Sequence, residues 1–176
     1  REVKRGLGDA YLYAFRIGLR EGYDALVEID ADLSHDPADL PMMLDLAERG
    51  IALVIGSRYI PGGSVIGWPR RRTWLSRWGN RYAGLVLGLA LNDATAGYRV
   101  YRADTLRTIG LDGVQADGYG FQVEMTHRLV GLGGKIVEFP ITFNDRVAGE
   151  SKLDKGIIGE ALALVMRLWV ADVRGR

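Results

Sequence analysis

The 176-residue sequence contains no cysteine, only two histidines and no long apolar run. Without cysteine there is no disulfide, no thiolate metal site and no cysteine nucleophile, and the chain is compatible with a reducing compartment such as the cytoplasm. The longest uninterrupted apolar stretch, 82–91, is about ten residues, half of the roughly 20 that a membrane-spanning helix needs. We therefore expect any contact with a membrane to be peripheral.

Familiar catalytic motifs are missing as well. The sequence has no nucleophile elbow and no phosphate-binding loop of the Gly-Lys-Ser type. His35 and His127 stand in contexts typical of a turn and of a helix surface, which disfavours acid–base catalysis through histidine. The net charge of +1 argues against a protein organised wholly around nucleic acid, so we expect no nucleic-acid partner.

The composition, 48% hydrophobic and 26% charged, is that of a globular domain, and we expect one domain over 1–176 because no repeat, linker or low-complexity tract interrupts the chain. The long loop 59–73 is expected to be functional, and 93–102 to be extended. Strands and helices alternate as in βαβ units, which predicts the α/β class. The predicted strands are 24–29, 51–55 and 135–139, and the predicted helices are about 10–22, 37–48, 74–89, 121–132 and 154–170.

Two carboxylates, Asp30 and Asp32, stand one residue apart where an apolar run ends. In open α/β sheets ligands bind outside the carboxyl ends of the strands. Magnesium and manganese favour carboxylate oxygens and keep waters and substrate phosphates as their other ligands. The motif therefore predicts a metal-bound diphosphate. The alternative is a solvated turn in which Asp36 caps a helix that Pro37 opens.

The segment 68–78 holds four arginines and three tryptophans in eleven residues. Guanidinium groups suit phosphate, and tryptophan favours the lipid headgroup layer, so the segment indicates a phosphate carried on a lipid. Two other interpretations stay open. One is a solvated basic helix start with the tryptophans in the core, and the other is a platform for single-stranded nucleic acid, which the near-neutral charge disfavours.

Further charged residues stand at predicted loops and strand ends. Arg58 follows a buried strand as Asp30 does, so we expect both to face one crevice, with Arg58 as a second phosphate ligand; the alternative is an exposed loop arginine. Arg146, Ser151 and Lys152 lie in a polar loop with glycine that could fold over an anionic ligand as a lid.

Asp93 and Glu124 each stand beside small residues and an aromatic residue, a composition that allows the close approach of a sugar. The alternatives are that Asp93 terminates the preceding helix and that Glu124 is an exposed helix residue.

Six motifs in a fixed order resemble the polyprenyl-phosphate (dolichyl-phosphate) mannose synthases, which are inverting family-two glycosyltransferases. They are Gly-Leu-Gly-x-Ala-Tyr at 6–11, Asp-Ala-Asp-x-Ser-His-Asp-Pro at 30–37, Gly-Ser-Arg-Tyr at 56–59, Asp-Ala-Thr-Ala-Gly-Tyr-Arg at 93–99, Gly-Tyr-x-Phe-Gln at 118–122, and Pro-Ile-Thr-Phe at 140–143 followed by Arg146 and Ser151-Lys152.

The resemblance implies a GT-A type, Rossmann-like fold around a central, mostly parallel sheet. It also implies GDP-mannose as the donor, a divalent metal (Mg²⁺ or Mn²⁺) as the cofactor and a polyprenyl phosphate as the acceptor. The expected location is the cytoplasmic face of a membrane, with a peripheral attachment, and a partner protein that anchors the chain there is left open.

The resemblance also implies roles for particular residues. The metal would be held by Asp30 and Asp32. The implied catalytic residues are Asp32, Arg58, Asp93 and Glu124, and the implied substrate-binding residues are Arg72, Ser76, Gln122, Arg146, Ser151 and Lys152, with Gln122 and Glu124 on mannose hydroxyls. The phosphate oxygen would attack directly, and since it is already anionic near pH 7 no general base is required.

Two departures from the family pattern are visible. Family members normally begin with two strands that carry Val-Pro-x-Tyr-Asn-Glu and Asp-Asp-x-Ser-x-Asp-Gly motifs, whereas this sequence starts after both. We therefore expect part of a larger synthase or a truncated domain, with an N-terminally incomplete sheet and an exposed edge. The second departure is Leu33, where many relatives carry glycine.

Two alternatives to mannose transfer stay open. One is the same chemistry with another sugar such as glucose, and the other is a non-catalytic role in binding polyprenyl phosphate or a partner protein.

Overall fold

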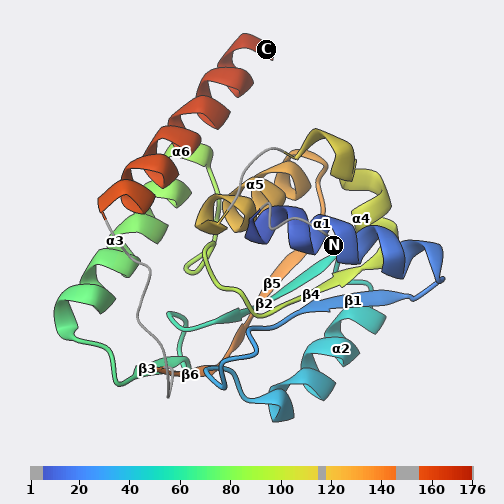
Figure 1. The fold of residues 1–176 in the computed structure, drawn as a ribbon, viewed down its shortest axis with the longest axis horizontal. Coiled ribbons are helices and arrows are strands. Elements are labelled where there is room, and N and C mark those ends of the chain that lie inside the picture. The colour runs from blue at the N-terminus through green and yellow to red at the C-terminus, as the bar shows by residue number, and fades with distance from the viewer. Residues whose placement is uncertain (1–5, 115–117, 146–154, 176) are drawn as a thin grey trace.

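The structure is a computed structural model that describes residues 6–114, 118–145 and 155–175. Its centre is a four-stranded sheet in the order β1-β4-β2-β5 (Figure 1). These strands are β1 (Ala25–Glu28), β4 (Arg99–Arg102), β2 (Leu53–Ser57) and β5 (Ile136–Pro140). The expected α/β architecture is therefore present.

The direction of the strands differs in one respect from the expected mostly parallel sheet. β1, β2 and β5 run the same way, but β4 lies between β1 and β2 and pairs antiparallel with both, so β2–β5 is the one parallel pair of this sheet in the described residues. The reason is the route of the chain. Asp93 accepts a hydrogen bond from Arg58, which directly follows β2. The chain therefore enters β4 at the carboxyl end of β2, and β4 runs in the opposite direction to β2.

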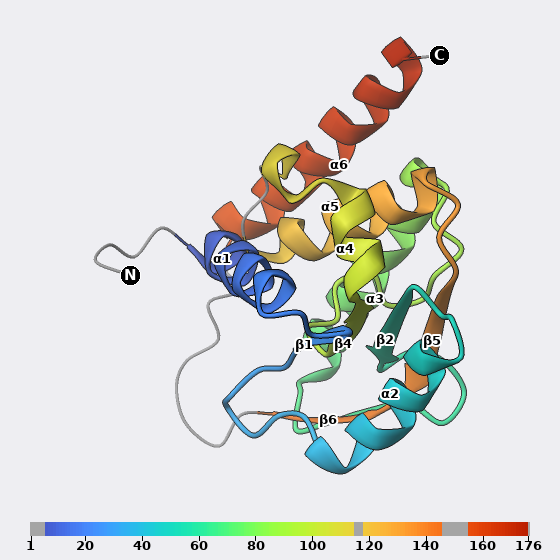
Figure 2. The same cartoon turned by 90° about the vertical axis from the view of Figure 1, so that its right-hand side faces the viewer.

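Helices cover both faces of the sheet (Figure 2). One layer contains α1, α4 and α5, and the opposite face is covered by α2. On the first side, α3 and α6 pack along each other next to α5. The bounds are α1 (Leu7–Arg20), α2 (Leu40–Glu48, after a 3-10 turn at Pro37–Asp39), α3 (Arg70–Leu87), α4 (Ala103–Ile109, followed by a 3-10 turn at Leu111–Gly113), α5 (Gly118–Gly131) and α6 (Lys155–Gly175).

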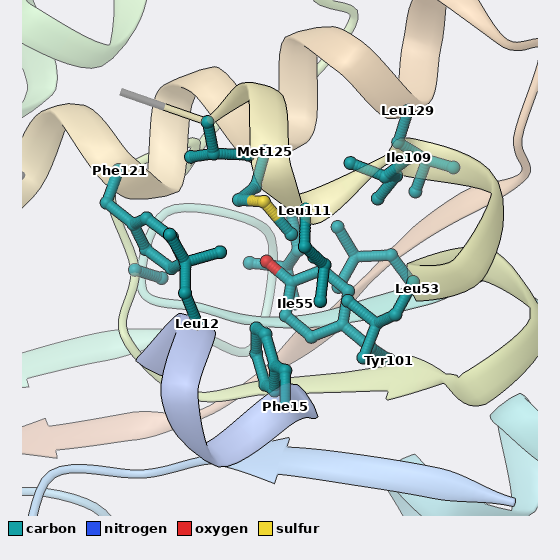
Figure 3. Close-up of a cluster of buried hydrophobic side chains, with 13 residues drawn as sticks. Leu12, Phe15, Leu53, Ile55, Tyr101, Ile109, Leu111, Phe121, Met125 and Leu129 are labelled. Atoms are coloured by element: carbon teal, nitrogen blue, oxygen red, sulfur yellow. The ribbon is translucent and has the colours of Figure 1, made fainter. Parts of the chain in front are cut away.

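The main core lies between the sheet and the first helix layer. Figure 3 shows Leu12 and Phe15 of α1, Tyr101 of β4, and Phe121 and Met125 of α5 together in one cluster. All five residues of β2 are buried, as expected for an apolar strand covered on both faces. This packing fixes the carboxyl ends of β1 and β2, from which the candidate site extends.

A second, two-stranded parallel sheet pairs β3 (Ser64–Ile66) with β6 (Thr142–Asn144). The sequence did not predict either strand, because three residues are too few to show a periodic pattern and the partner lies far along the chain. The prediction of an extended 93–102 is right only for β4, since 93–98 forms turns, and α4 was not predicted. The β3–β6 ribbon matters for function because it carries the segment 64–68 to the site.

No helix in the described parts of the chain combines the length and the apolar character needed to cross a membrane.

Candidate functional site

The Asp-x-Asp motif forms a tight turn directly after β1. The Asp30 side chain is 40% exposed, and its Oδ2 lies 3.6 Å from Nε2 of the buried His35. Oδ1 of Asp32 accepts hydrogen bonds from the amide and the hydroxyl of Ser34. Between them Leu33 has a positive φ of 64°, which gives the turn its shape.

Asp36 also performs the role given to it by the alternative interpretation. Its carboxylate accepts a hydrogen bond from the amide of Ala38 at 2.9 Å and so caps the turn that opens with Pro37. The capping interaction uses Asp36 alone. It therefore accounts for the end of the motif and involves neither Asp30 nor Asp32.

The donor set of the turn fits a hard divalent cation. Within the residues that the structure describes, no group of three or more His, Asp or Glu side chains is placed to hold a metal. Magnesium is nevertheless commonly bound through one or two carboxylates, with water and substrate phosphate oxygens completing the coordination. Asp30 and Asp32 supply that minimum, while the absence of cysteine makes a soft-metal site unsuitable.

Glu28 is a buried carboxylate that sequence reasoning missed. It ends β1, two residues before Asp30, and within the described residues neither of its oxygens has a hydrogen-bond partner. Burial raises the pKa of Glu28 from 4.5 to about 7, and the nearby charge of Arg99 opposes that shift, as does the side chain of Gln122 to a smaller extent. The sequence signal that could have identified it is a glutamate directly after the apolar run 25–27.

Arg58 and Asp93 form a buried ion pair. Nε and Nη2 of Arg58 donate to the two carboxylate oxygens of Asp93 at 2.7 and 2.6 Å, and the amide of Arg58 also donates to Asp93. Both side chains are almost completely buried, which excludes the alternative of an exposed loop arginine. The predicted roles of the two residues in catalysis stay predictions.

The ion pair is held by polar residues from two further elements, α3 and β5. Asn80 of α3 donates to Asp93 and accepts from the amide of Thr95, and Glu138 of β5 accepts from the amide of Asp93 and from Ser57. Neither Asn80 nor Glu138 was predicted from the sequence as a site residue. Their spacing in the chain offered no signal, because they meet only in the folded state.

The segment 93–97 connects the two strand ends. It starts at Asp93 and ends at Gly97, where an added Cβ would lie 3.4 Å from Oδ2 of Asp30. The segment thus runs from the Arg58 region to the Asp30 region, and the crevice that the two residues were expected to share stays a prediction. Arg99 links the segment to α5, because its buried guanidinium donates to the carbonyls of Ala94 and Ala96 in the segment and to the carbonyl of Gln122 on α5.

Gln122 and Glu124 are both buried on α5. Among the residues that the structure describes, Oε1 of Gln122 has no hydrogen-bond partner, whereas Glu124 accepts from Nε of Arg128 at 2.9 Å. Burial excludes the alternative that Glu124 is an exposed helix residue. The predicted contacts of both residues with a sugar stay predictions.

Arg72 and Ser76 lie one turn apart on the inner face of α3. The guanidinium carbon of Arg72 lies 3.9 Å from the centre of the Trp68 ring, and its Nη1 lies 3.2 Å from Oδ1 of Asp145. Ser76 accepts a hydrogen bond from the hydroxyl of Tyr59, whose pKa is raised by burial although Arg58 opposes the shift. The amphipathic α3 thus gathers the predicted phosphate ligands on one side.

The β3–β6 ribbon joins this cluster to the Asp-x-Asp turn. The amide of Asn144, the residue before Asp145, donates to the carbonyl of Ser34 at 3.0 Å. The candidate cation ligands and the candidate phosphate ligands are therefore neighbours. Arg146, Ser151 and Lys152, the predicted lid residues, lie outside the described residues.

The outer face of α3 carries the other tryptophans of the segment. Trp74 and Trp78 are 67% and 43% exposed, and Leu85 further along the helix is 76% exposed. The interpretation that placed these tryptophans in the core is therefore wrong for Trp74 and Trp78. Exposed aromatic residues next to arginine agree with a membrane-facing surface.

Comparisons with known proteins agree with one another. The family model described as glycosyl transferase family 2 matches residues 1–110. The chain is 55% identical over 171 residues to an undecaprenyl-phosphate mannosyltransferase of Micrococcus luteus, covering 97% of this chain and 70% of that protein. It is 48% identical over 176 residues to a polyprenol monophosphomannose synthase of Mycolicibacterium smegmatis, covering 100% of this chain and 65% of that protein.

A solved structure shares the fold. The glucosyl-3-phosphoglycerate synthase of Mycobacterium tuberculosis, crystallised with Mn²⁺, uridine diphosphate and phosphoglyceric acid, superposes with a TM-score of 0.68 at 18% sequence identity. The match covers 96% of this chain and 56% of that chain. At this identity the likeness bears on the fold, and it supports the GT-A type architecture.

Proposed function

The chain belongs to glycosyl transferase family 2, and from that membership we propose that it transfers mannose from GDP-mannose to the phosphate of a polyprenyl lipid. The names of the two relatives support mannose transfer to a polyprenyl phosphate. One structural observation carries the proposal: the amide of Asn144, the residue before the Arg72 partner Asp145, donates to the carbonyl of Ser34 and so joins the Arg72 region to the loop of Asp30 and Asp32. Such a pair of sites suits two phosphate-bearing substrates.

The proposed reaction is a single displacement with inversion. An oxygen of the lipid phosphate forms a bond to the anomeric carbon of mannose, while the bond from that carbon to the diphosphate breaks and GDP leaves from the opposite face. The attacking phosphate is already anionic near pH 7, so no side chain needs to remove a proton. This agrees with the surroundings of His35, which is buried between the rings of Tyr98 and Phe143.

The roles of the residues follow from where the charges must lie. Asp30 and Asp32 would hold a divalent cation, whose chemistry is to neutralise the leaving diphosphate. Arg72 and Ser76 would orient the acceptor phosphate. The Arg58–Asp93 pair would keep segment 93–97 in place between the two substrates, and Gln122 and Glu124 would contact the sugar. Arg146, Ser151 and Lys152 would complete the acceptor site.

We further propose that the protein works at the cytoplasmic face of a membrane, to which it binds peripherally. The exposed tryptophans of α3 support this, as do the exposed Arg71 and Arg81, which stand three residues before Trp74 and three after Trp78, because tryptophan prefers the headgroup layer and arginine pairs with lipid phosphate.

The assay uses the protein at its full natural length, radiolabelled GDP-mannose and a polyprenyl phosphate in detergent with Mg²⁺ or Mn²⁺. The expected result is label in an organic-extractable mannolipid that disappears with chelator, and less label with UDP-glucose as the donor. Asp32→Ala should abolish transfer and leave the fold intact. Normal transfer by Asp32→Ala would refute the metal assignment, and phosphate-lipid binding without turnover would favour a non-catalytic role.

Asp36→Ala is the matched control for this experiment. Asp36 lies in the same loop but caps the turn at Pro37, so its loss should lower stability by about 1 kcal/mol without abolishing transfer. Equal loss of transfer in both variants would mean that disruption of the loop, and not loss of a cation ligand, explains the Asp32 result.

A further inference from the structure

Two arginines approach Trp68, and they use their guanidinium groups differently. The planar edge formed by Nε and Nη2 is one of the two-donor edges that match a carboxylate or a phosphate. Arg58 places both of these donors on Asp93, at 2.7 and 2.6 Å. Its bidentate edge is therefore engaged inside the protein, although the guanidinium carbon lies 5.5 Å from the Trp68 ring.

Arg72 leaves the corresponding edge available. Its hydrogen bond to Asp145 runs through Nη1 alone, at 3.2 Å. Nε of Arg72 is buried without a hydrogen-bond partner, and Nη2 donates to no residue in the part of the chain that the structure describes. A buried donor without a partner is costly, so an Nε–H in this state indicates an edge prepared for an anion.

The carboxylate of Asp145 is held by contacts that do not involve Arg72. The amide of Asp145 donates to the carbonyl of Ile66 at 2.9 Å, and Nε1 of Trp68 donates to Oδ1 at 3.1 Å. Gly67, with a φ of 87°, permits this approach, because a Cβ at that position would lie 2.8 Å from Cβ of Asp145. The position of Oδ1 is thus set by the β3–β6 ribbon.

The Arg72 side chain is therefore fixed from two sides. Trp68 supports the face of the guanidinium at 3.9 Å, and Asp145 binds one corner of it. Ser76 lies one helical turn after Arg72 on the same side of α3. Asn144, the residue before Asp145, donates its amide hydrogen to the carbonyl of Ser34 in the Asp-x-Asp turn. An anion on the open edge would lie within the candidate site.

We propose that Asp145 is a positioning residue of the acceptor site: by holding Nη1, it orients Arg72 so that the Nε–Nη2 edge receives the phosphate of the acceptor. The identity of the anion rests on the proposed function. A carboxylate beside Arg72 also weakens the positive charge that attracts phosphate. Orientation and charge therefore have opposite effects, and two substitutions separate them.

Asp145→Asn removes the charge but keeps an oxygen that accepts from Trp68 and Arg72, whereas Asp145→Ala removes both. If orientation is the function of Asp145, Asp145→Ala should raise KM for the polyprenyl phosphate by about tenfold, the range of one lost hydrogen bond to a charged group. Asp145→Asn should keep this KM at or below that of the wild type. KM for the sugar donor should stay unchanged in both variants.

The result that would overturn the proposal is a lower or unchanged acceptor KM in Asp145→Ala, because then the carboxylate competes with phosphate or does nothing. A fall in kcat with unchanged acceptor KM would overturn it as well. Asp112→Ala is the matched control, since it removes another Arg–Asp pair, Arg16–Asp112 at 2.7 Å, from the exposed surface. It should leave both KM values unchanged.

Binding of a short-chain polyprenyl phosphate, measured by calorimetry without donor, makes the test independent of turnover. The same order of affinities is expected: wild type and Asp145→Asn tight, Asp145→Ala weak. If the wild type binds in this pattern but transfers no mannose, the proposed function fails and the inference stands. If the wild type transfers mannose and Asp145→Ala binds as tightly, only the inference fails.

Discussion

At the scale of single residues, Leu33 has an unusual conformation. Its φ of 64° lies in the left-handed region, and the side chain is 77% exposed, so no burial compensates for the strain. Such a conformation costs a non-glycine residue about 1–2 kcal/mol. Glycine adopts such a φ without strain, so the backbone of the turn suits glycine at this position.

Leu33→Gly should therefore raise the free energy of unfolding by about 0.5–1 kcal/mol, after allowance for the greater freedom of glycine in the unfolded chain. Urea denaturation of the metal-free protein, with an unchanged slope, measures this difference. Leu33→Ala should be nearly neutral because it keeps the strain, and Leu33→Val should destabilise. A loss of stability in the glycine variant would show that the Leu33 side chain makes a stabilising contact.

At the scale of elements, α3 combines two functions on two faces. Arg72, Ser76 and Asn80 recur every four residues on the inner face, where they meet the β3–β6 ribbon and the Asp93 segment. Trp74 and Trp78 share the outer face. The helical repeat thus places the predicted phosphate ligands and the predicted membrane contacts within one helix.

Replacing both Trp74 and Trp78 by serine should weaken partition into vesicles that contain anionic lipid by about tenfold or more, because two large apolar side chains no longer leave water. Co-sedimentation measures the partition, and kcat on a short-chain acceptor in detergent should stay near that of the wild type. Tyr23→Ser is the control, since Tyr23 is another strongly exposed aromatic residue and lies in the connection between α1 and β1. Equal partition of all variants would refute a membrane-facing α3.

At the scale of the whole molecule, the Asp93 cluster connects elements that are distant in sequence. Arg58 at the end of β2, Asn80 of α3 and Glu138 of β5 all bond to Asp93 or to its backbone. The cluster is buried, so its charges are exposed to little solvent screening. Loss of the central carboxylate would leave Arg58 as a buried cation without its counter-charge.

Asp93→Asn should therefore lower the free energy of unfolding by about 3–5 kcal/mol. Asp104→Asn, which breaks the exposed Arg102–Asp104 pair, should change it by less than about 1 kcal/mol. Urea unfolding compares the two. The double replacement Arg58→Met with Asp93→Leu should be less destabilising than Asp93→Asn alone, and a larger loss would mean that the ion pair contributes more than an apolar contact of similar size.

Several features of the fold and the site were predictable because they depend on neighbouring residues. The apolar runs indicated β1, β2 and β5, the Asp36–Pro37 pair indicated the start of a helix, and the motif order indicated the family that the comparisons confirm. Other features were not predictable. Arg58 and Asp93 are 35 residues apart, and Trp68 and Asp145 are 77 apart, so nothing local announces their contacts.

The sequence by itself determined the α/β class, the membership in a glycosyltransferase family and the list of candidate metal and phosphate ligands. Periodicity, caps and motif order are local properties that a chain carries before it folds. Only the tertiary structure decided which arginine keeps an open bidentate edge: Arg58 is engaged by Asp93, while Arg72 is held at one corner by Asp145. The physical reason is that a guanidinium group takes its function from its partners, and those partners are brought to it by the packing of β2, α3 and the β3–β6 ribbon.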